Sequence, residues 1–262
     1  MITLTPADWA IQTDGLVRDF GSFRAVAGVD LRVPRGCFYG FLGPNGAGKS
    51  TTIKMLTGLL RPTAGGAKVL GLDLERDLLA IKRRIGVVPE GLALFERLTA
   101  REYLMFVGRM HGLDRETILH RSAELIDLMD LEGAAGSLVA GYSTGMRKKL
   151  AVAATLLHAP DVYFLDEPFE GIDAIVSRQI RDALQLVVAR GATVFLTSHI
   201  LEIVDRLCTH VGIIDRGRLI ADGPVEDYRK DGQHRTVEEI FLELVGADER
   251  KAESLTWLGG GG

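Results

Sequence analysis

Short apolar runs alternate with longer amphipathic stretches along most of this chain. Four runs have the length and continuity of buried strands: residues 37–42, 85–88, 162–165 and 193–198. Helical spacing of apolar residues is found in the stretches between and after them, at 51–60, 77–84 and 174–190. Continuous apolar strands separated by helices predict an α/β fold with a mainly parallel sheet.

Two other regions have the pattern of antiparallel strands. Residues 1–8 are expected to be a loose end, and the chain from Trp9 to Val33 then reads as strands with a turn at Phe20-Gly21. The other expected strands are the alternating segment 29–33, a short strand with turns in 65–74, and a hairpin of 211–215 with 218–221 turned at 216–217. These regions predict an N-terminal antiparallel β subdomain beside the parallel sheet.

A long helical block interrupts the α/β pattern. The sequence from Leu98 to Leu157 is almost entirely helical in spacing, with breaks at Gly112, at 133–136 and at Gly141, and Thr99 to Glu102 fits a capping box. We therefore predict a single domain over 1–262 whose α/β core, 9–96 and 159–225, contains an inserted α-helical subdomain at 97–158. A C-terminal helix within 226–246, opened by Thr236 and Glu239, and a flexible tail at 247–262 complete the division.

Composition narrows the classes of protein that fit. The chain has 262 residues, 47% of them hydrophobic, and a net charge of −4, so it can bury a large core but has no basic field for a nucleic-acid partner. Its two cysteines, Cys37 and Cys208, have neither disulfide-framework nor metal-site spacing, which fits a reducing cytoplasm. No signal pattern is present and no apolar run reaches about 18 residues, so a membrane role would require a partner chain.

A phosphate-binding loop is the strongest chemical signal. The motif G-x-x-x-x-G-K-[ST] is matched in full, and the segment comprises Gly43, Pro44, Asn45, Gly46, Ala47, Gly48, Lys49, Ser50 and Thr51. Glycines allow backbone N–H groups to face an anion, Lys49 would reach the β- and γ-phosphates, and the Ser50 hydroxyl would bind Mg²⁺. The alternative is a plain glycine-rich turn, but the preceding strand and following helix are the context that a phosphate loop requires.

Two acids follow the buried run at 162–165. Asp166 at the end of such a strand would lie beside the phosphate loop and hold Mg²⁺, and Glu167 would polarise the attacking water. Asn45 is the only asparagine in the chain, which excludes guanine recognition through an Asn-Lys-x-Asp motif.

A third segment has less meaning by itself. Ser143 is a good N-cap for a helix that continues with Arg147, Lys148 and Lys149. Alone, this stretch predicts an ordinary capped helix with a solvated basic face.

Taken together, these segments resemble the ATP-binding subunit of ABC transporters, from about Gly15 to Val245. The resemblance implies that the phosphate loop is the Walker A motif, that 162–166 is Walker B, and that Glu167 is the catalytic glutamate. It also implies that 143–146 is the signature motif with contacts from Ser143 and Gly145, that 170–173 is the D-loop, and that 88–90 is the loop that usually carries a glutamine. His199 matches the switch histidine, against the alternative of a packed histidine, and Phe20 matches the aromatic that stacks on adenine, against that of plain core.

The resemblance further implies ATP and Mg²⁺ as ligands, with Ser50, Glu90 and Asp166 as metal ligands. Two such subunits pair head to tail, as a homodimer or heterodimer, and dock on a separate transmembrane permease at the cytoplasmic face of the membrane, so the chain would be a peripheral membrane ATPase. Several positions depart from the usual pattern: Glu90 replaces glutamine, Thr144 and Met146 replace signature residues, and Phe169-Glu170 replaces small hydroxyl residues. The last change places a carboxylate at the expected interface between the two subunits.

The segments 142–146 and 237–243 look like those of exporter-type subunits, and Gly91 to Phe95 could form a groove for a permease helix or simply pack between lobes. Alternative functions are a non-transport ABC ATPase and an assembly or regulatory nucleotide-binding subunit. The insert is too short for the coiled coils of chromosome-type proteins, and the presence of Glu167 and His199 argues against a degenerate subunit.

Overall fold

The computed structural model describes residues 8–229 and 236–246. The strands are β1 (Trp9–Phe20), β2 (Phe23–Val29), β3 (Arg32–Pro34), β4 (Phe38–Leu42), β5 (Ala64–Val69), β6 (Leu72–Asp73), β7 (Ile85–Val88), β8 (Val162–Asp166), β9 (Thr193–Thr197), β10 (His210–Asp215) and β11 (Arg218–Pro224). The helices are α1 (Lys49–Leu56), α2 (Leu78–Arg84), α3 (Ala100–Met110), α4 (Arg115–Leu128), α5 (Thr144–Leu156), α6 (Ala174–Ala189), α7 (Leu201–Leu207), α8 (Val225–Tyr228) and α9 (Val237–Val245), with 3₁₀ turns at Glu132–Ala134 and Val139–Gly141.

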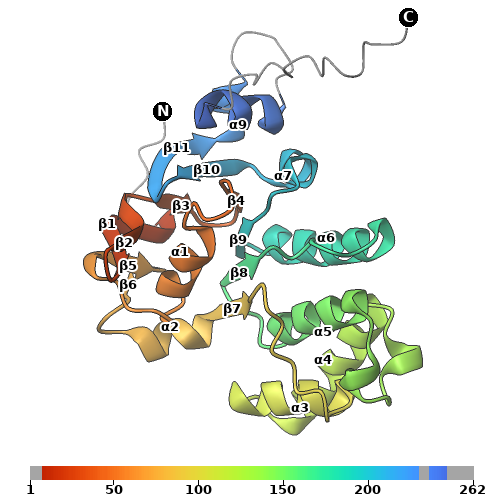
Figure 1. The fold of residues 1–262 in the computed structure, drawn as a ribbon. Coiled ribbons are helices and arrows are strands. Elements are labelled where there is room, and N and C mark those ends of the chain that lie inside the picture. Colours follow the sequence, from red (N-terminus) through yellow and green to blue (C-terminus); the bar gives the residue numbers. More distant parts are fainter. Residues whose placement is uncertain (1–7, 230–235, 247–262) are drawn as a thin grey trace, which may run out of the picture.

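Two sheets organise the molecule. The larger has six strands in the order β11-β10-β4-β9-β8-β7, of which β11 is antiparallel to β10 and the others are parallel. The smaller is antiparallel, with the order β2-β1-β5-β6 and β3 paired to β1. Helices α3, α4 and α5 lie together beyond β7, on the side of the large sheet away from the small one (Figure 1). The predicted α/β class, antiparallel β part and helical insert are therefore confirmed.

Alternation along the parallel strands creates two cores. Successive side chains of a strand point to opposite faces, and Phe164 packs with the apolar residues of α1 and the small sheet while Leu165 packs with those of α5 and α6. Phe195 and Leu196 of β9 divide in the same way. Because both faces of the sheet are covered, residues of both parities along these strands are apolar. The strands therefore appear in the sequence as continuous apolar runs and could be predicted from it.

The helical lobe is capped as predicted. Thr99 accepts a hydrogen bond from the backbone N–H of Glu102, and the Glu102 carboxylate accepts one from the Thr99 N–H, which completes the capping box of α3. Ser143 caps α5 by accepting from the N–H of Met146. Thr236 and Glu239 form a second capping box at α9.

Some expected elements differ from the structure. The alternating segment 29–33 is not one strand, because β2 ends at Val29 and β3 begins at Arg32. At this break the Thr13 hydroxyl donates to the Val29 carbonyl and accepts from the Leu31 N–H, so a side chain replaces ladder bonds. Helix α1 begins at Lys49 and ends at Leu56, earlier than expected at both ends, and α7 was not predicted at all.

The predictions for residues 1–7 and for the tail at 247–262 lie outside the described residues. The division of the chain at 97–158 and at 226 stays a prediction.

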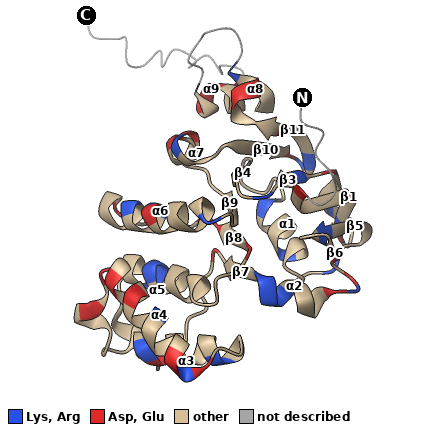
Figure 2. Ribbon diagram, turned by 180° about the vertical axis from the view of Figure 1, so that it is seen from behind, with Lys and Arg blue, Asp and Glu red and all other residues tan. Residues whose placement is uncertain are grey.

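No helix within 8–229 or 236–246 has both the length and the apolar character that crossing a membrane requires. Acidic and basic residues are mixed along α3, α4 and α6 (Figure 2), in keeping with the small net charge.

Gly86 lies where strand β7 of the large sheet packs closely against helix α5 of the helical lobe, and this close packing leads to a stability prediction. A Cβ at Gly86 would lie 2.4 Å from Cγ2 of Thr155 in α5, whereas one at Gly91 would meet nothing within 4 Å. We expect Gly86→Ala to lower the free energy of unfolding by about 1–3 kcal/mol, because β7 and α5 must separate. Urea denaturation measures this change. Gly91→Ala is the control and should stay within about 0.5 kcal/mol of wild type; equal effects of the two variants would contradict the prediction.

Candidate functional site

The candidate site lies at the carboxyl edge of the large sheet. Strands β4, β9 and β8 are neighbours and parallel, with Phe41 opposite Thr197 and Asp166 opposite Thr197 in their registers. The loop after β4 and the final residues of β8 and β9 therefore reach the same edge. Ligands of open α/β sheets bind at this edge.

The loop after β4 is shaped by its glycines. A Cβ at Gly43 would lie 2.3 Å from the carbonyl oxygen of Ile214, and one at Gly48 would lie 2.6 Å from that of Ala25. Gly46 and Gly48 also have left-handed φ angles, of 80° and 111°. The loop thus packs against β2 and β10 so closely that side chains at Gly43 and Gly48 would not fit.

Lys49 begins α1 directly after this loop. Its ammonium donates to the carbonyl oxygens of Gly43, at 2.7 Å, and Pro44, at 3.3 Å. The residue is buried, so the ammonium group lies inside the loop and is largely shielded from solvent. Strand, glycine loop and helix follow one another as the motif predicts, which places Lys49 and the first N–H groups of α1 where they can face an anion.

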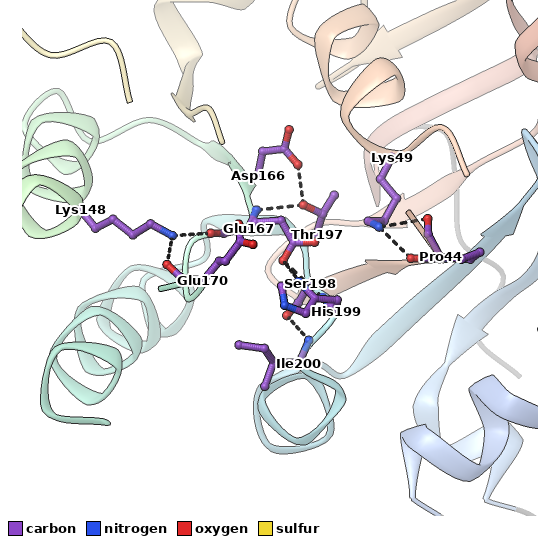
Figure 3. A network of polar contacts seen from close by, with 11 residues as sticks. Pro44, Lys49, Lys148, Asp166, Glu167, Glu170, Thr197, Ser198, His199 and Ile200 are labelled. Atoms are coloured by element: carbon purple, nitrogen blue, oxygen red, sulfur yellow. Dashed lines mark hydrogen bonds and ion pairs between the residues drawn. The ribbon is translucent and has the colours of Figure 1, made fainter. Parts of the chain in front are cut away.

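Thr197 connects the ends of β8 and β9. Its hydroxyl donates to Oδ1 of Asp166 at 2.6 Å and accepts from the backbone N–H of Glu167 at 3.0 Å (Figure 3). All three residues are buried. One hydroxyl therefore fixes both the carboxylate that ends β8 and the backbone of the residue after it.

Glu167 has an unusual backbone and a specific side-chain partner. Its φ angle is 50°, a left-handed value that is uncommon for a residue with a Cβ and is found at functional sites. Its Oε2 accepts from the backbone N–H of His199 at 3.3 Å and lies 2.9 Å from His199 Nδ1. The His199 side chain is 49% exposed, so it is not a packed core histidine.

Lys148 corrects the expectation of a solvated basic face on α5. Lys148 and Lys149 are only 7% and 6% exposed. The Lys148 ammonium donates to the carbonyl oxygens of Glu167, at 2.8 Å, and Glu170, at 2.5 Å. Burial lowers the pKa of Lys148 below its usual value, while the nearby carboxylates of Glu170, Glu167 and Glu90 act in the opposite direction. The spacing of charges on α5 contained no signal for this, because the partners are carbonyl groups distant in sequence.

A cavity of about 530 Å³ joins these elements. Its lining residues are Phe20, Phe23, Ala25, Asn45, Gly46, Gly48, Lys49, Ser50, Thr51, Glu90, Glu167, Glu170 and His199. Most predicted site residues are thus brought together. Phe23 and Ala25 are additions that the sequence did not single out, since neither belongs to a motif.

The remaining predicted residues lie elsewhere. Gly43, Pro44 and Ala47 belong to the loop but do not line the cavity, and Asp166 is buried and does not line it either. Ser143 and Gly145, at the start of α5, are not among the lining residues.

Phe20 is 46% exposed, with the Arg18 guanidinium 4.6 Å from its ring centroid, so it is not plain core. The ring lines the cavity, and the Arg18 guanidinium lies over one of its faces.

The three residues predicted to bind Mg²⁺ all carry side-chain oxygen atoms. Ser50 supplies a hydroxyl, and Glu90 and Asp166 supply carboxylates, which are ligand types that suit Mg²⁺. Within 8–229 and 236–246, no group of three His, Cys, Asp or Glu residues forms a metal cluster.

The fold and the loop–lysine–carboxylate site define a P-loop nucleotide-binding domain with an inserted helical lobe. The model of the ABC transporter family matches residues 26–170, more than half of the chain. The chain belongs to the ABC transporter family, as an ATP-binding subunit.

Individual relatives agree with this assignment. The daunorubicin/doxorubicin resistance ATP-binding protein DrrA of Streptomyces peucetius is 45% identical over 214 residues, which are 82% of this chain and 65% of DrrA. The bacitracin transport ATP-binding protein BcrA of Bacillus licheniformis is 35% identical over 243 residues, 92% of this chain and 76% of BcrA. Among solved structures, an ATP-binding subunit of an ABC transporter matches with a TM-score of 0.84 and 30% identity, covering 90% of this chain and 99% of that one.

The Thr197 bridge generates a second prediction. Thr197→Val keeps the shape of the side chain but leaves the Glu167 N–H and Asp166 Oδ1 without their hydroxyl partner in a buried place. We expect the free energy of unfolding to fall by about 1–3 kcal/mol, measured by chemical denaturation. Thr155→Val is the matched control, since the buried Thr155 hydroxyl donates only to the Ala151 carbonyl within α5. The prediction is wrong if both variants lose the same small amount.

Proposed function

We propose that this chain binds and hydrolyses ATP to power export of a substrate through a separate membrane permease. The observation that supports this best is the Glu167–His199 pair, which lies at the cavity that also holds Lys49 and the phosphate loop. Transfer of a phosphoryl group to water needs a carboxylate that orients the water and a loop with a lysine that binds the phosphates. The cavity contains both. The names of the relatives, concerned with drug resistance and bacitracin transport, support the exporter subclass. The transported substrate would be selected by the permease.

Binding of ATP would use this cavity after a rotation of the Lys49 side chain. The N–H groups of the loop and of α1, with Lys49 turning from the Gly43 carbonyl to phosphate, hold the triphosphate, and Phe20 stacks on adenine. Ser50 and Asp166, with Glu90, would hold Mg²⁺. When bound, Mg²⁺ offsets the negative charge that develops on the phosphate oxygens.

Hydrolysis would depend on Glu167 and His199. The Glu167 carboxylate accepts a hydrogen bond from water and orients it in line with the γ-phosphate. His199 is within hydrogen-bonding distance of Glu167 and donates toward the γ-phosphate, so the two residues act as one unit. Glu170 places an extra carboxylate at this cavity, in the segment that resembles the D-loop, and we infer that turnover persists despite it.

Dimerisation would complete the site. Ser143 is exposed and Gly145 half-buried, yet neither lines the cavity of its own subunit. We infer that they close on ATP held by a second copy or a close relative of this chain, so that ATP favours the closed pair. Hydrolysis removes these contacts and the pair opens.

Docking on the permease would use a groove beside the helical lobe. A cavity of about 410 Å³ lies between β7, the segment 89–94 and helices α3 and α5, and Leu92, Ala93 and Leu94 line it. Its size and the apolar residues in its lining would suit a short helix of a membrane protein, and we infer from this that the subunit binds at the cytoplasmic face of the membrane. A subunit that binds ATP only for assembly, or one that acts outside transport, is the alternative, and the predictions below separate these cases.

The role of Glu167 is tested by Glu167→Gln. We expect ATP turnover to fall by roughly 100-fold or more, because the amide cannot accept a proton, while ATP affinity stays within about threefold. The same variant should form an ATP-dependent dimer in Mg·ATP, measured by light scattering. Glu202→Gln, which removes an exposed carboxylate paired with Arg206 on α7, is the control for loss of an ion-paired carboxylate outside the cavity.

Two results would contradict this proposal. A wild-type assembly with its permease that binds ATP but never turns it over would support the assembly-only alternative. A Glu167→Gln chain that stays monomeric in Mg·ATP and fails to lock a permease complex closed would refute the pairing of subunits.

The groove is tested by a charge at its rim. Ala93 is exposed, so Ala93→Glu should not disturb folding, but it would bury an unpaired carboxylate beneath a docked helix. We expect ATP turnover of the isolated subunit within about twofold of wild type and at least tenfold less co-purification with the permease. Leu119→Glu, an exposed site on α4 outside the groove, is the control. Glu96 is less suitable than Ala93, because its carboxylate is paired with Arg147 at 2.7 Å.

A further inference from the structure

Two buried lysines follow each other on α5 and point to different partners. Lys149 contacts Asp130, with its ammonium 3.4 Å from the Asp130 carbonyl and 3.7 Å from the carboxylate, so it stays within the helical lobe. Lys148 leaves the lobe and reaches the segment after β8, where it donates to the carbonyls of Glu167 and Glu170 (Figure 3). Lys148 is therefore a direct polar link between the helical lobe and the backbone of Glu167.

This link acts on a strained part of the chain. The carbonyl of Glu167 accepts from Lys148 and also from the N–H of Glu170, at 3.3 Å, while its N–H donates to Thr197. These bonds hold both peptide groups of a residue whose φ is 50°. Such a conformation persists only where the surroundings impose it. Of the groups that restrain the Glu167 backbone, Lys148 is the one that belongs to the helical lobe.

The cost of burying Lys148 argues for a specific role. Lysine is rarely buried without a paired carboxylate, since its charge loses hydration, and the partners of Lys148 are carbonyl oxygens. An apolar side chain at this position would anchor α5 to the segment without that cost. What the ammonium adds is the orientation of two peptide carbonyls.

We propose that Lys148 is a positioning residue that couples the signature end of α5 to the catalytic Glu167 of the same subunit. Ser143 caps the helix on which Lys148 lies. Because the two residues lie within about two turns of one hydrogen-bonded helix, they move as one body. When Ser143 meets ATP on a second subunit, the shift of α5 is passed through Lys148 to Glu167. Each subunit thus sets its own carboxylate in response to the ATP of the other site. This inference rests on the proposed function.

The experiment compares Lys148→Met with Lys149→Met, a change of the same size at the next position. Hydrogen exchange of the amides in 167–173 is measured first, without nucleotide, and we expect at least a tenfold increase in exchange rate in Lys148→Met only. In steady-state ATP hydrolysis, Lys148→Met should lower kcat at least tenfold with KM within threefold, and Lys149→Met should keep kcat within twofold. Lys148→Arg retains donors and charge and should recover at least a third of wild-type kcat.

Every result decides between the alternatives. Equal exchange and equal kcat in the two methionine variants would overturn the proposal, as would a Lys148→Arg variant no better than Lys148→Met. If Lys148→Met fails to fold, Lys148→Gln replaces it, and the same order relative to Lys149→Met is expected. Absence of turnover in wild type would count against ATP hydrolysis, whereas the exchange measurement would still test the link.

Discussion

The register of neighbouring parallel strands is the constraint on which this site depends. Asp166 lies opposite Thr197, and Phe41 lies opposite Thr197 on the other side, so three strand ends are held at one level. A slip of one residue in β8 would exchange Phe164 and Leu165 between the two cores and turn Asp166 away from Thr197. Hydrophobic packing on both faces of the sheet thus fixes the polar geometry at its edge.

Two kinds of contact then meet at Glu167. Its backbone is held by Thr197 from the sheet and by Lys148 from the helical lobe, while its side chain is held by His199. The left-handed φ is maintained by this combination, which no single element provides. A residue positioned from two lobes is sensitive to their relative movement, and one positioned by the sheet alone is not.

Sequence reasoning was strongest where one local rule decides the outcome. Buried strands contain continuous apolar runs, such as 85–88 and 162–165, and the capping boxes at Thr99 and Thr236 follow directly from residue spacing. It failed where a distant group decides. The break after Val29 depends on the Thr13 hydroxyl, and α7 was missed because its apolar residues follow the buried run of β9 with a gap of only three residues. The burial of Lys148 depends on carbonyls that the chain brings near only after folding.

The charges around the cavity give these contacts a common explanation. Three carboxylates line the cavity, those of Glu90, Glu167 and Glu170. Among the described residues, Lys49 is the only lysine or arginine in its lining. A triphosphate would meet more carboxylates than cationic side chains there, so loop N–H groups and the start of α1 must supply much of the attraction. Lys148 lies within electrostatic reach of all three carboxylates, behind the cavity wall. Its positive charge makes the negative potential of Glu90 and Glu170 weaker at the cavity, and this gives a physical reason why these two departures from the usual pattern would be compatible with a bound triphosphate.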